Sequence, residues 1–333
     1  ETLSNIILVG DWLFAQHLFG PHGTGELANG REDLIRAEGP NILASLERYQ
    51  IDDQAIVERI IPAFLDDCLE RIPWRRYAVV GFTSVFVQHA ASLLLARRIK
   101  SNWPGIRIVL GGANVAGPMG RETLRAFEWV DHVVDGEGEE AFPELVRRIR
   151  SGRSAAGLPG VSSREGTSLH FTAGPAPLPA LEKVPVPDYA EFFEAFRDLP
   201  GDRGTPRILY EGARGCWWGQ KRPCTFCSQN VQSLAFRAKS ARRVRRELAV
   251  LARRHECLNF EAVDNVLDPG HLRELFPALA RDGCDYKLFY DVRACLTRRQ
   301  VALLRSAGVR ALEVGIEGLH DGVLRLMRKG VSA

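Results

Sequence analysis

The sequence lacks the features that mark membrane proteins, secreted proteins and nucleic-acid binders. No apolar run approaches the roughly 20 residues that a membrane-spanning helix needs, and no basic region precedes an apolar stretch at the amino end. Lysine and arginine exceed the acidic residues by only 44 to 41, which is far too small an excess for a dedicated nucleic-acid binder. We therefore expect a cytoplasmic protein with no membrane and no nucleic-acid partner.

The cysteines do not follow the pattern of a disulfide-stapled protein either. There are seven of them, an odd number, and three lie within twelve residues, at Cys216, Cys224 and Cys227. Disulfide frameworks use dispersed, even-numbered cysteines, so this spacing favours the ligation of a metal or a cluster. The other four are expected to be apolar fillers: Cys68, Cys257, Cys284 and Cys295.

The chain is long enough for two domains, and residues 1–150 have the pattern of the first. Apolar strands are predicted at 77–81, 106–110 and 130–134, each followed by a segment of helical period. Strands that alternate with helices at this spacing indicate an α/β fold with a doubly wound parallel sheet.

Small and polar residues follow each of these strands. In parallel sheets, ligands bind beyond the carboxyl ends of the strands, so these turns are candidate binding sites. Glycine in such turns is also ordinary turn chemistry, and this alternative stays open. The candidates are Thr83, Ser84, Gly111, Gly112, Asn114, Gly136 and Glu137.

Residues 151–205 are rich in proline and are expected to form a stiff linker. In residues 206–333 the alternation resumes, with strands predicted at 207–210, 258–263, 286–290 and 310–314. Four strand-helix units are fewer than a parallel barrel usually has, which predicts a partial (β/α) barrel that is truncated at its carboxyl end. Few strands precede Tyr77, so the first domain is expected to be incomplete at its amino end.

The cysteine loop directly follows the first strand of the second domain. Three thiolates on a cubane iron-sulfur cluster leave one iron open, and a small molecule with an amine and a carboxylate can occupy it. Glycines at 212, 215 and 219 allow the backbone to approach such a cluster. The alternative is a structural zinc site, for which His255 or Cys257 would be the fourth ligand.

This loop resembles that of radical S-adenosylmethionine (SAM) enzymes. Its Cys-x7-Cys-x2-Cys spacing, with Trp217, Trp218 and Gly219, is similar to the branch that matures ribosomally made peptides, often by cobalamin-dependent C-methylation. The resemblance implies a 4Fe-4S cluster on the three cysteines and SAM on its open iron, with Phe226 bordering the adenine.

Further residues are implied by the same resemblance. Strand-end polar groups of the family meet the ribose and the methionine part, which makes Asp264, Asn265 and Glu317 candidates. Asp264 and Asn265 could equally form an ordinary turn, and Glu317 could cap the following helix.

The first domain resembles the cobalamin-binding domain of this branch, on the three strand-end stretches named above. Cobalamin, as methylcobalamin, is therefore an expected cofactor. The Asp-x-His-x-x-Gly loop that supplies a cobalt ligand elsewhere is absent, since Ala15 stands at the aspartate position before His17. We expect no histidine on cobalt.

The activity that the resemblance implies is methyl transfer to an unactivated carbon of a precursor peptide. The reduced cluster would cleave SAM to a radical that removes a substrate hydrogen, and methylcobalamin would supply the methyl group. The expected partners are that peptide and an electron donor such as flavodoxin or ferredoxin. Two alternatives remain: a radical peptide modification without methyl transfer, such as epimerisation or cyclisation, and a non-catalytic remnant.

Overall fold

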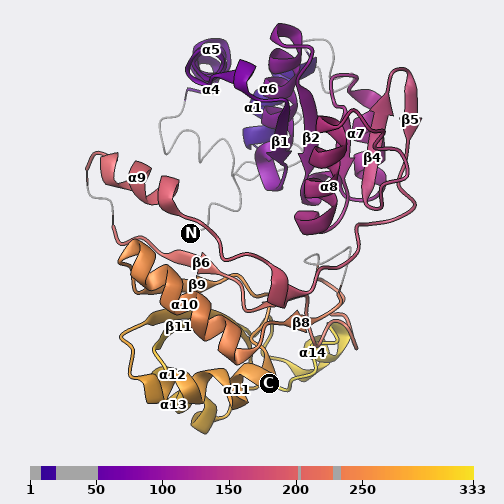
Figure 1. Cartoon of the computed structure of the whole chain (residues 1–333). Helices are drawn as coiled ribbons and strands as arrows, with labels where there is room; N and C mark the ends of the chain where they lie inside the picture. Colours follow the sequence, from indigo (N-terminus) through magenta and orange to yellow (C-terminus); the bar gives the residue numbers. More distant parts are fainter. Residues whose placement is uncertain (1–8, 20–51, 202–203, 228–233) are drawn as a thin grey trace. The chain divides into compact units, whose positions relative to one another are not determined.

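The computed structural model describes residues 9–19, 52–201, 204–227 and 234–333 (Figure 1). The chain divides into two compact units, Glu1–Pro179 and Ala180–Ala333. Within the described ranges, no helix combines the length and the apolar character needed to cross a membrane.

The first unit is built on a five-stranded sheet in the order β1-β2-β3-β4-β5. β1, β2 and β3 run parallel, whereas β4 and β5 are antiparallel to their neighbours. The strands are β1 (Val79–Thr83), β2 (Arg107–Gly111), β3 (His132–Val134), β4 (Val161–Glu165) and β5 (Ser168–His170).

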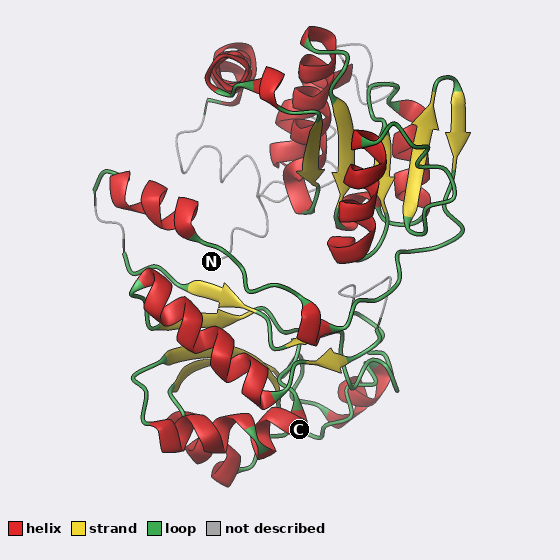
Figure 2. Cartoon of the chain, viewed as in Figure 1, coloured by secondary structure: helices red, strands yellow, loops and turns green. Residues whose placement is uncertain are grey.

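Helices cover both faces of this sheet (Figure 2). Successive side chains of β2 point to opposite faces, so Leu110 packs with Leu93 and Leu94, whereas Val109 packs with Leu145. The doubly wound arrangement is confirmed for the three parallel strands. The α-helices are α1 (Val9–Phe19), α4 (Asp53–Ala55), α5 (Ile61–Arg71), α6 (His89–Asn102), α7 (Pro118–Ala126) and α8 (Gly138–Arg150). Shorter turns are the π-helix Ile56–Ile60 and the 3-10 helices Trp74–Arg76, Phe86–Gln88 and Ala113–Val115.

The structure corrects the predicted linker at 151–205. Its first part holds β4 and β5, which extend the sheet, and the compact unit ends only at Pro179. The remainder carries the 3-10 helix Leu181–Lys183 and α9 (Ala190–Asp198). The sequence did not predict β4, because this strand is short and mostly polar. It is held by backbone hydrogen bonds to β3, and such bonds leave no signature in the sequence.

The second unit is built on four parallel strands in the order β11-β10-β9-β6. Strands that follow one another in the chain are neighbours in the sheet, which confirms four consecutive strand-helix units. The strands are β6 (Ile208–Tyr210), β9 (Asn259–Ala262), β10 (Lys287–Arg293) and β11 (Val309–Gly315). The helices are α10 (Ala241–His255), α11 (Pro269–Arg273), α12 (Leu275–Asp282), α13 (Arg298–Ser306) and α14 (Asp321–Leu326).

A small antiparallel ribbon joins the two ends of the cysteine loop. Its strands are β7 (Ala213–Arg214) and β8 (Arg237–Ala238). Gly215, which directly follows β7, has φ +77°, and a Cβ at this position would lie 2.3 Å from the carbonyl oxygen of Ala235. Only glycine lets the two ends of the loop come this close.

Candidate active site

The three predicted ligand cysteines share one loop at the carboxyl end of β6. They are reduced thiols; Cys216 and Cys224 are half-buried and Cys227 is exposed. The backbone N–H of Gly219 donates to the Sγ of Cys216 over 3.3 Å. Burial raises the pKa of Cys224, the cations Lys329 and Arg293 lower it, and the charges of the other two thiols raise it. Cys216 and Cys227 thus lie near enough to Cys224 to act on its pKa.

The alternative of a zinc site with a fourth ligand does not fit this geometry. His255 ends α10 and Cys257 precedes β9, so both lie at the amino edge of the sheet, opposite the cysteine loop. The ring of His255 stacks on Phe193 at 4.8 Å, and the thiol of Cys257 points to the carbonyl of Pro206. Among the described residues, no group of three or more histidine, cysteine or acidic side chains is arranged to hold a single metal ion.

An ion pair lies beside the thiols. The ammonium of Lys329 is 2.5 Å from the carboxylate of Glu317 and 5.6 Å from the ring centroid of Phe226. Lys329 is only 7% exposed, and Glu317 adopts φ +53°, a conformation that few residues other than glycine accept. Lys329 thus lies close to both Glu317 and Phe226, which the sequence had predicted as site residues. Lys329 itself was not predicted, because nothing in its local sequence distinguishes it.

A second buried cation was also missed. Arg293 is the last residue of β10 and is 8% exposed, with its guanidinium 4.3 Å from the ring centroid of Trp218 and 5.5 Å from that of Trp217. It also donates a hydrogen bond to the carbonyl of Lys329. Its position at the carboxyl end of a parallel strand was a signal that could have identified it.

Asp264 lies buried beneath the start of the cysteine loop. It is 1% exposed, and its Oδ1 accepts a hydrogen bond from the backbone N–H of Gly212 over 2.7 Å. Burial raises its pKa to about 7, although the N–H groups of Ala213 and Gly212 act in the opposite direction. Its Oδ1 thus holds the start of the loop, and a contact of Asp264 with the ribose or the methionine part stays a prediction. Its neighbour Asn265 is half-buried.

Further buried polar groups hold the other end of the loop. The N–H of Lys239 donates to the carbonyl of Gly212 over 2.8 Å, and a ring nitrogen of His271 contacts the carbonyl of Lys239 at 2.8 Å. The ammonium of Lys239 lies 2.9 Å from the carboxylate of Glu247, and both side chains are buried. Arg243 completes the pairing of this carboxylate at 2.7 Å. Since each charge has a partner, the network can fix the base of the loop without an uncompensated buried ion.

The candidates of the first unit surround the carboxyl ends of β1, β2 and β3. Thr83 and Gly111 end neighbouring strands in register, and the exposed Gly112 follows. Ser84 is fully buried, and its hydroxyl bonds to His89 at 3.1 Å and to Asn114 at 3.2 Å. Ser84 and Asn114 therefore shape this edge.

Close approach of the backbone decides which residues fit here. Gly112 has φ +97°, and a Cβ on it would lie 2.6 Å from the carbonyl oxygen of Ser84. Gly136 is exposed and has φ +91°, and a Cβ on it would lie 2.9 Å from the Cβ of Pro175. The half-buried Glu137 follows it in the chain. An exposed edge of small residues fits a large planar ligand such as cobalamin, which needs access to the backbone.

His17 was the partial match to a cobalt-binding loop. Its Nε2 lies 2.6 Å from the carbonyl oxygen of Val57, so this nitrogen is engaged within the unit. Gly20, the last residue of that match, lies outside the described residues.

Comparison with known proteins identifies relatives that extend over both units. The chain is 27% identical to "Uncharacterized methyltransferase PH0819" of Pyrococcus horikoshii, covering 76% of this chain and 54% of that protein. It is 26% identical to "Hopanoid C-3 methylase" of Methylococcus capsulatus, covering 88% and 56%. It is 24% identical to "Anaerobic magnesium-protoporphyrin IX monomethyl ester cyclase" of Rubrivivax gelatinosus, covering 79% of this chain and 48% of that protein. The chain thus spans about half the length of these curated relatives.

Solved structures share the fold. The cobalamin-dependent SAM radical enzyme OxsB, with aqua-cobalamin and SAM bound, matches with a TM-score of 0.60 at 18% identity, covering 82% of this chain and 39% of that chain. The radical SAM methyltransferase TsrM from Kitasatospora setae, with cobalamin and a [4Fe-4S] cluster bound, also has a TM-score of 0.60 at 18% identity, covering 84% and 57%.

The family model "Radical SAM superfamily" matches residues 210–333, the part of the chain that contains the cysteine loop, the Glu317–Lys329 pair and Arg293. This family implies a 4Fe-4S cluster and SAM as cofactors, and the three thiols supply the donor set for that cluster. Residues 210–333 therefore match the Radical SAM superfamily, in a chain whose fold resembles that of solved cobalamin-dependent radical SAM enzymes.

Proposed function

We propose that the protein is a cobalamin-dependent radical SAM methyltransferase that methylates an unactivated carbon of a ribosomally synthesised peptide. The observation that carries the radical chemistry is the set of three thiols in one loop at the carboxyl end of β6. Methyl transfer is supported by two relatives that are named as a methyltransferase and a methylase. The peptide substrate is supported by the resemblance of the loop, with its cysteine spacing and Trp217-Trp218-Gly219.

The side chains around the thiols have the chemistry that SAM requires. When bound, the cluster supplies the electron that cleaves SAM homolytically. The ammonium of Lys329 can bind the carboxylate of the methionine part, and the carboxylate of Glu317 can accept hydrogen bonds from amine or hydroxyl groups. The exposed ring of Phe226 offers an apolar surface to the adenine. The N–H of Gly219 stabilises negative charge on the sulfur of Cys216.

Cobalamin would be held at the carboxyl edge of the first unit. The backbone around Gly111, Gly112 and Gly136 is accessible there, and Thr83, Asn114 and Glu137 can offer polar contacts. When bound, the cofactor carries the methyl group. We further propose a cytoplasmic location, because its reducing environment keeps the ligand cysteines as thiols.

The test is methylation of precursor peptides by the protein reconstituted without oxygen. With SAM carrying a labelled methyl group, we expect label in the peptide, at a level that depends on added cobalamin. The variant Cys224→Ala should abolish the labelling, whereas Cys284→Ala, at an exposed cysteine of the same domain, should retain it. A reconstituted protein that binds zinc and no iron or sulfide would overturn the proposal.

A second candidate is a radical modification without methyl transfer. It is favoured by the relative that is named as a cyclase. In that case the radical chemistry would modify the substrate, but no label from the methyl group of SAM would enter the product. Mass analysis of the same reaction therefore separates the two candidates.

A further inference from the structure

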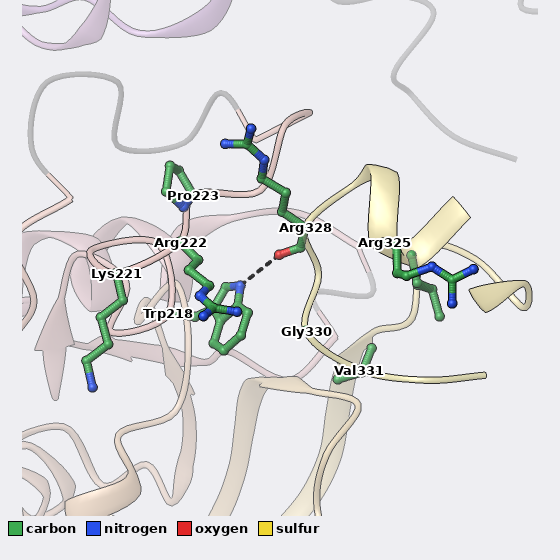
Figure 3. Close-up of a pocket in the computed structure, with 9 residues that line it drawn as sticks. Trp218, Lys221, Arg222, Pro223, Arg325, Arg328, Gly330 and Val331 are labelled. Atoms are coloured by element: carbon green, nitrogen blue, oxygen red, sulfur yellow. Dashed lines mark hydrogen bonds between the residues drawn. The ribbon is translucent and has the colours of Figure 1, made fainter. Parts of the chain in front are cut away.

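A pocket of about 490 Å³ adjoins the cysteine loop in the second unit (Figure 3). One wall comes from the loop itself, with Lys221 and Arg222, and the other from the segment that starts in α14, with Arg325 and Arg328. Trp218 lies between the two walls. We call this site the basic pocket, because its nine lining residues include these four cations and no acidic side chain.

The charges of the basic pocket are not used within the described part of the domain. All four side chains are exposed, and none has an ion-pair partner among the described residues. Two arginines elsewhere in the same unit are paired: Arg243 contacts Glu247 at 2.7 Å and Arg245 contacts Asp282 at 2.7 Å. Four positive charges around one pocket, with no acidic side chain among the lining residues, favour an anionic partner.

The basic pocket has a short connection to the thiols. Trp218 is two residues from Cys216, and its indole N–H donates to the carbonyl of Arg328 over 3.0 Å. The Sγ of Cys224 lies 4.0 Å from the same carbonyl oxygen. Gly330 packs so closely on the indole that a Cβ there would lie 2.0 Å from the ring. A partner seated on the basic pocket would therefore be separated from the thiol site by little more than one layer of side chains.

We propose that the basic pocket is the docking surface of an acidic electron-carrier protein that reduces the cluster. This inference rests on the proposed function, since a cluster that cleaves SAM has to be reduced. One electron passes from the reduced donor protein to the cluster. The donor is thereby oxidised by one electron and the cluster is reduced by one electron. No bond is formed or broken and no proton needs to move.

The physical properties of the site suit such a partner. Electron transfer weakens steeply with distance, so the donor has to dock close to the cluster ligands. Electron-transfer complexes bury little surface and dissociate readily, and charge complementarity sets their rate of association. Positive charge close to the cluster ligands fits a transient complex with an acidic protein.

The first experiment measures binding alone, with the cluster-free protein and oxidised flavodoxin as the probe. The variant replaces Lys221, Arg222, Arg325 and Arg328 by glutamine. Its matched control replaces four exposed arginines of α10 and α13 by glutamine: Arg242, Arg246, Arg298 and Arg299. We expect the dissociation constant to rise tenfold or more in the variant, with a weaker dependence on salt, and to change less than twofold in the control. Equal weakening in both proteins would overturn the proposal.

The second experiment compares two reductants in SAM cleavage by the reconstituted protein. Dithionite needs no docking surface, so the variant should cleave SAM at the parent rate with it. With reduced flavodoxin, the variant should be at least tenfold slower than parent and control. An unchanged flavodoxin-dependent rate would overturn the docking surface and leave the proposed function intact. If the parent cleaves no SAM with dithionite, the proposed function fails, and the binding experiment still decides on the surface.

Two further outcomes have a defined meaning. If the variant binds the precursor peptide more weakly and binds flavodoxin normally, the basic pocket belongs to the substrate and the proposal is wrong. If the fourfold variant does not fold, the pairs Lys221→Gln with Arg222→Gln and Arg325→Gln with Arg328→Gln are measured separately. Each pair should then show part of the loss in flavodoxin binding.

Discussion

The carboxyl edges of the two sheets are built from different materials. In the first unit the edge is formed by backbone and small side chains, with Gly112 and Gly136 in conformations that favour glycine. In the second unit it carries thiols and charged side chains, among them Cys224, Lys329 and Arg293. Both edges lie where parallel sheets bind ligands. The comparison shows that one edge offers an accessible backbone of small residues, whereas the other offers sulfur ligands and charged side chains.

The largest effect is expected from removing one thiol. In Cys224→Ala, the cluster should be lost completely, because two remaining thiolates do not hold a cubane that already has an open corner. Iron and sulfide counting after reconstitution without oxygen measures this. Cys295→Ala, at an exposed cysteine in the same domain, is the control and should bind iron as the parent does. Normal iron content in Cys224→Ala would show that iron binding in the second unit does not require the sulfur of Cys224.

The corresponding change in the first unit adds a single methyl group. Gly112→Ala combines a strained φ with a Cβ 2.6 Å from the carbonyl oxygen of Ser84, and should lower the free energy of unfolding by about 3 kcal/mol. Gly157→Ala separates strain from crowding, since Gly157 also has positive φ but open space around it. It should cost about 1 kcal/mol. Denaturant unfolding measures both, and equal losses would refute the role of close packing at this edge.

The anchor beneath the cysteine loop should respond to pH. Because burial raises the pKa of Asp264 in the folded state to about 7, the folded protein binds this proton more tightly than the unfolded chain does. Its contribution to stability is therefore present at low pH and is lost as the pH rises towards 7. The side chain of Asp264→Asn does not titrate. Between pH 5 and pH 8, the free energy of unfolding of the parent should therefore fall by about 2 kcal/mol relative to that of the variant. Urea unfolding at pH 5 and pH 8 measures this. If parent and variant differ by the same free energy of unfolding at both pH values, the raised pKa of Asp264 is contradicted.

A smaller effect is expected from the lysine beside Glu317. Lys329→Gln removes the cation that can bind the carboxylate of SAM, and should weaken SAM binding to the reconstituted protein about tenfold. Equilibrium dialysis with labelled SAM measures this. Lys287→Gln, at an exposed lysine where β10 begins, is the matched control and should leave the affinity unchanged. Unchanged affinity in both would show that the charged edge does not select SAM through Lys329.

Much of the fold could be predicted from the sequence, because the signals are local. Parallel strands have continuous apolar runs, and the four strands of the second unit were placed to within a few residues. β4 was missed because its Ser162 and Ser163 are polar although buried. The cysteine loop was recognised because its ligands are close together in the chain.

The rest of the site could not be predicted, because it depends on contacts between distant residues. Asp264 looks like a strand-end ligand in the sequence, but the fold turns its carboxyl group towards Gly212, 52 residues away. Lys329 and Arg293 became site residues only when the segment after α14 packed on the loop.

The sequence by itself determined the alternation of strands and helices and the triad of thiols, since both depend on spacings of a few residues. Only the tertiary structure decided which charges surround those thiols and which carboxyl group lies buried beneath them. The physical reason is that burial and pairing of charge are set by neighbours in space. The carbonyl of Arg328, which reaches Cys224 across 104 positions of the chain, is one example.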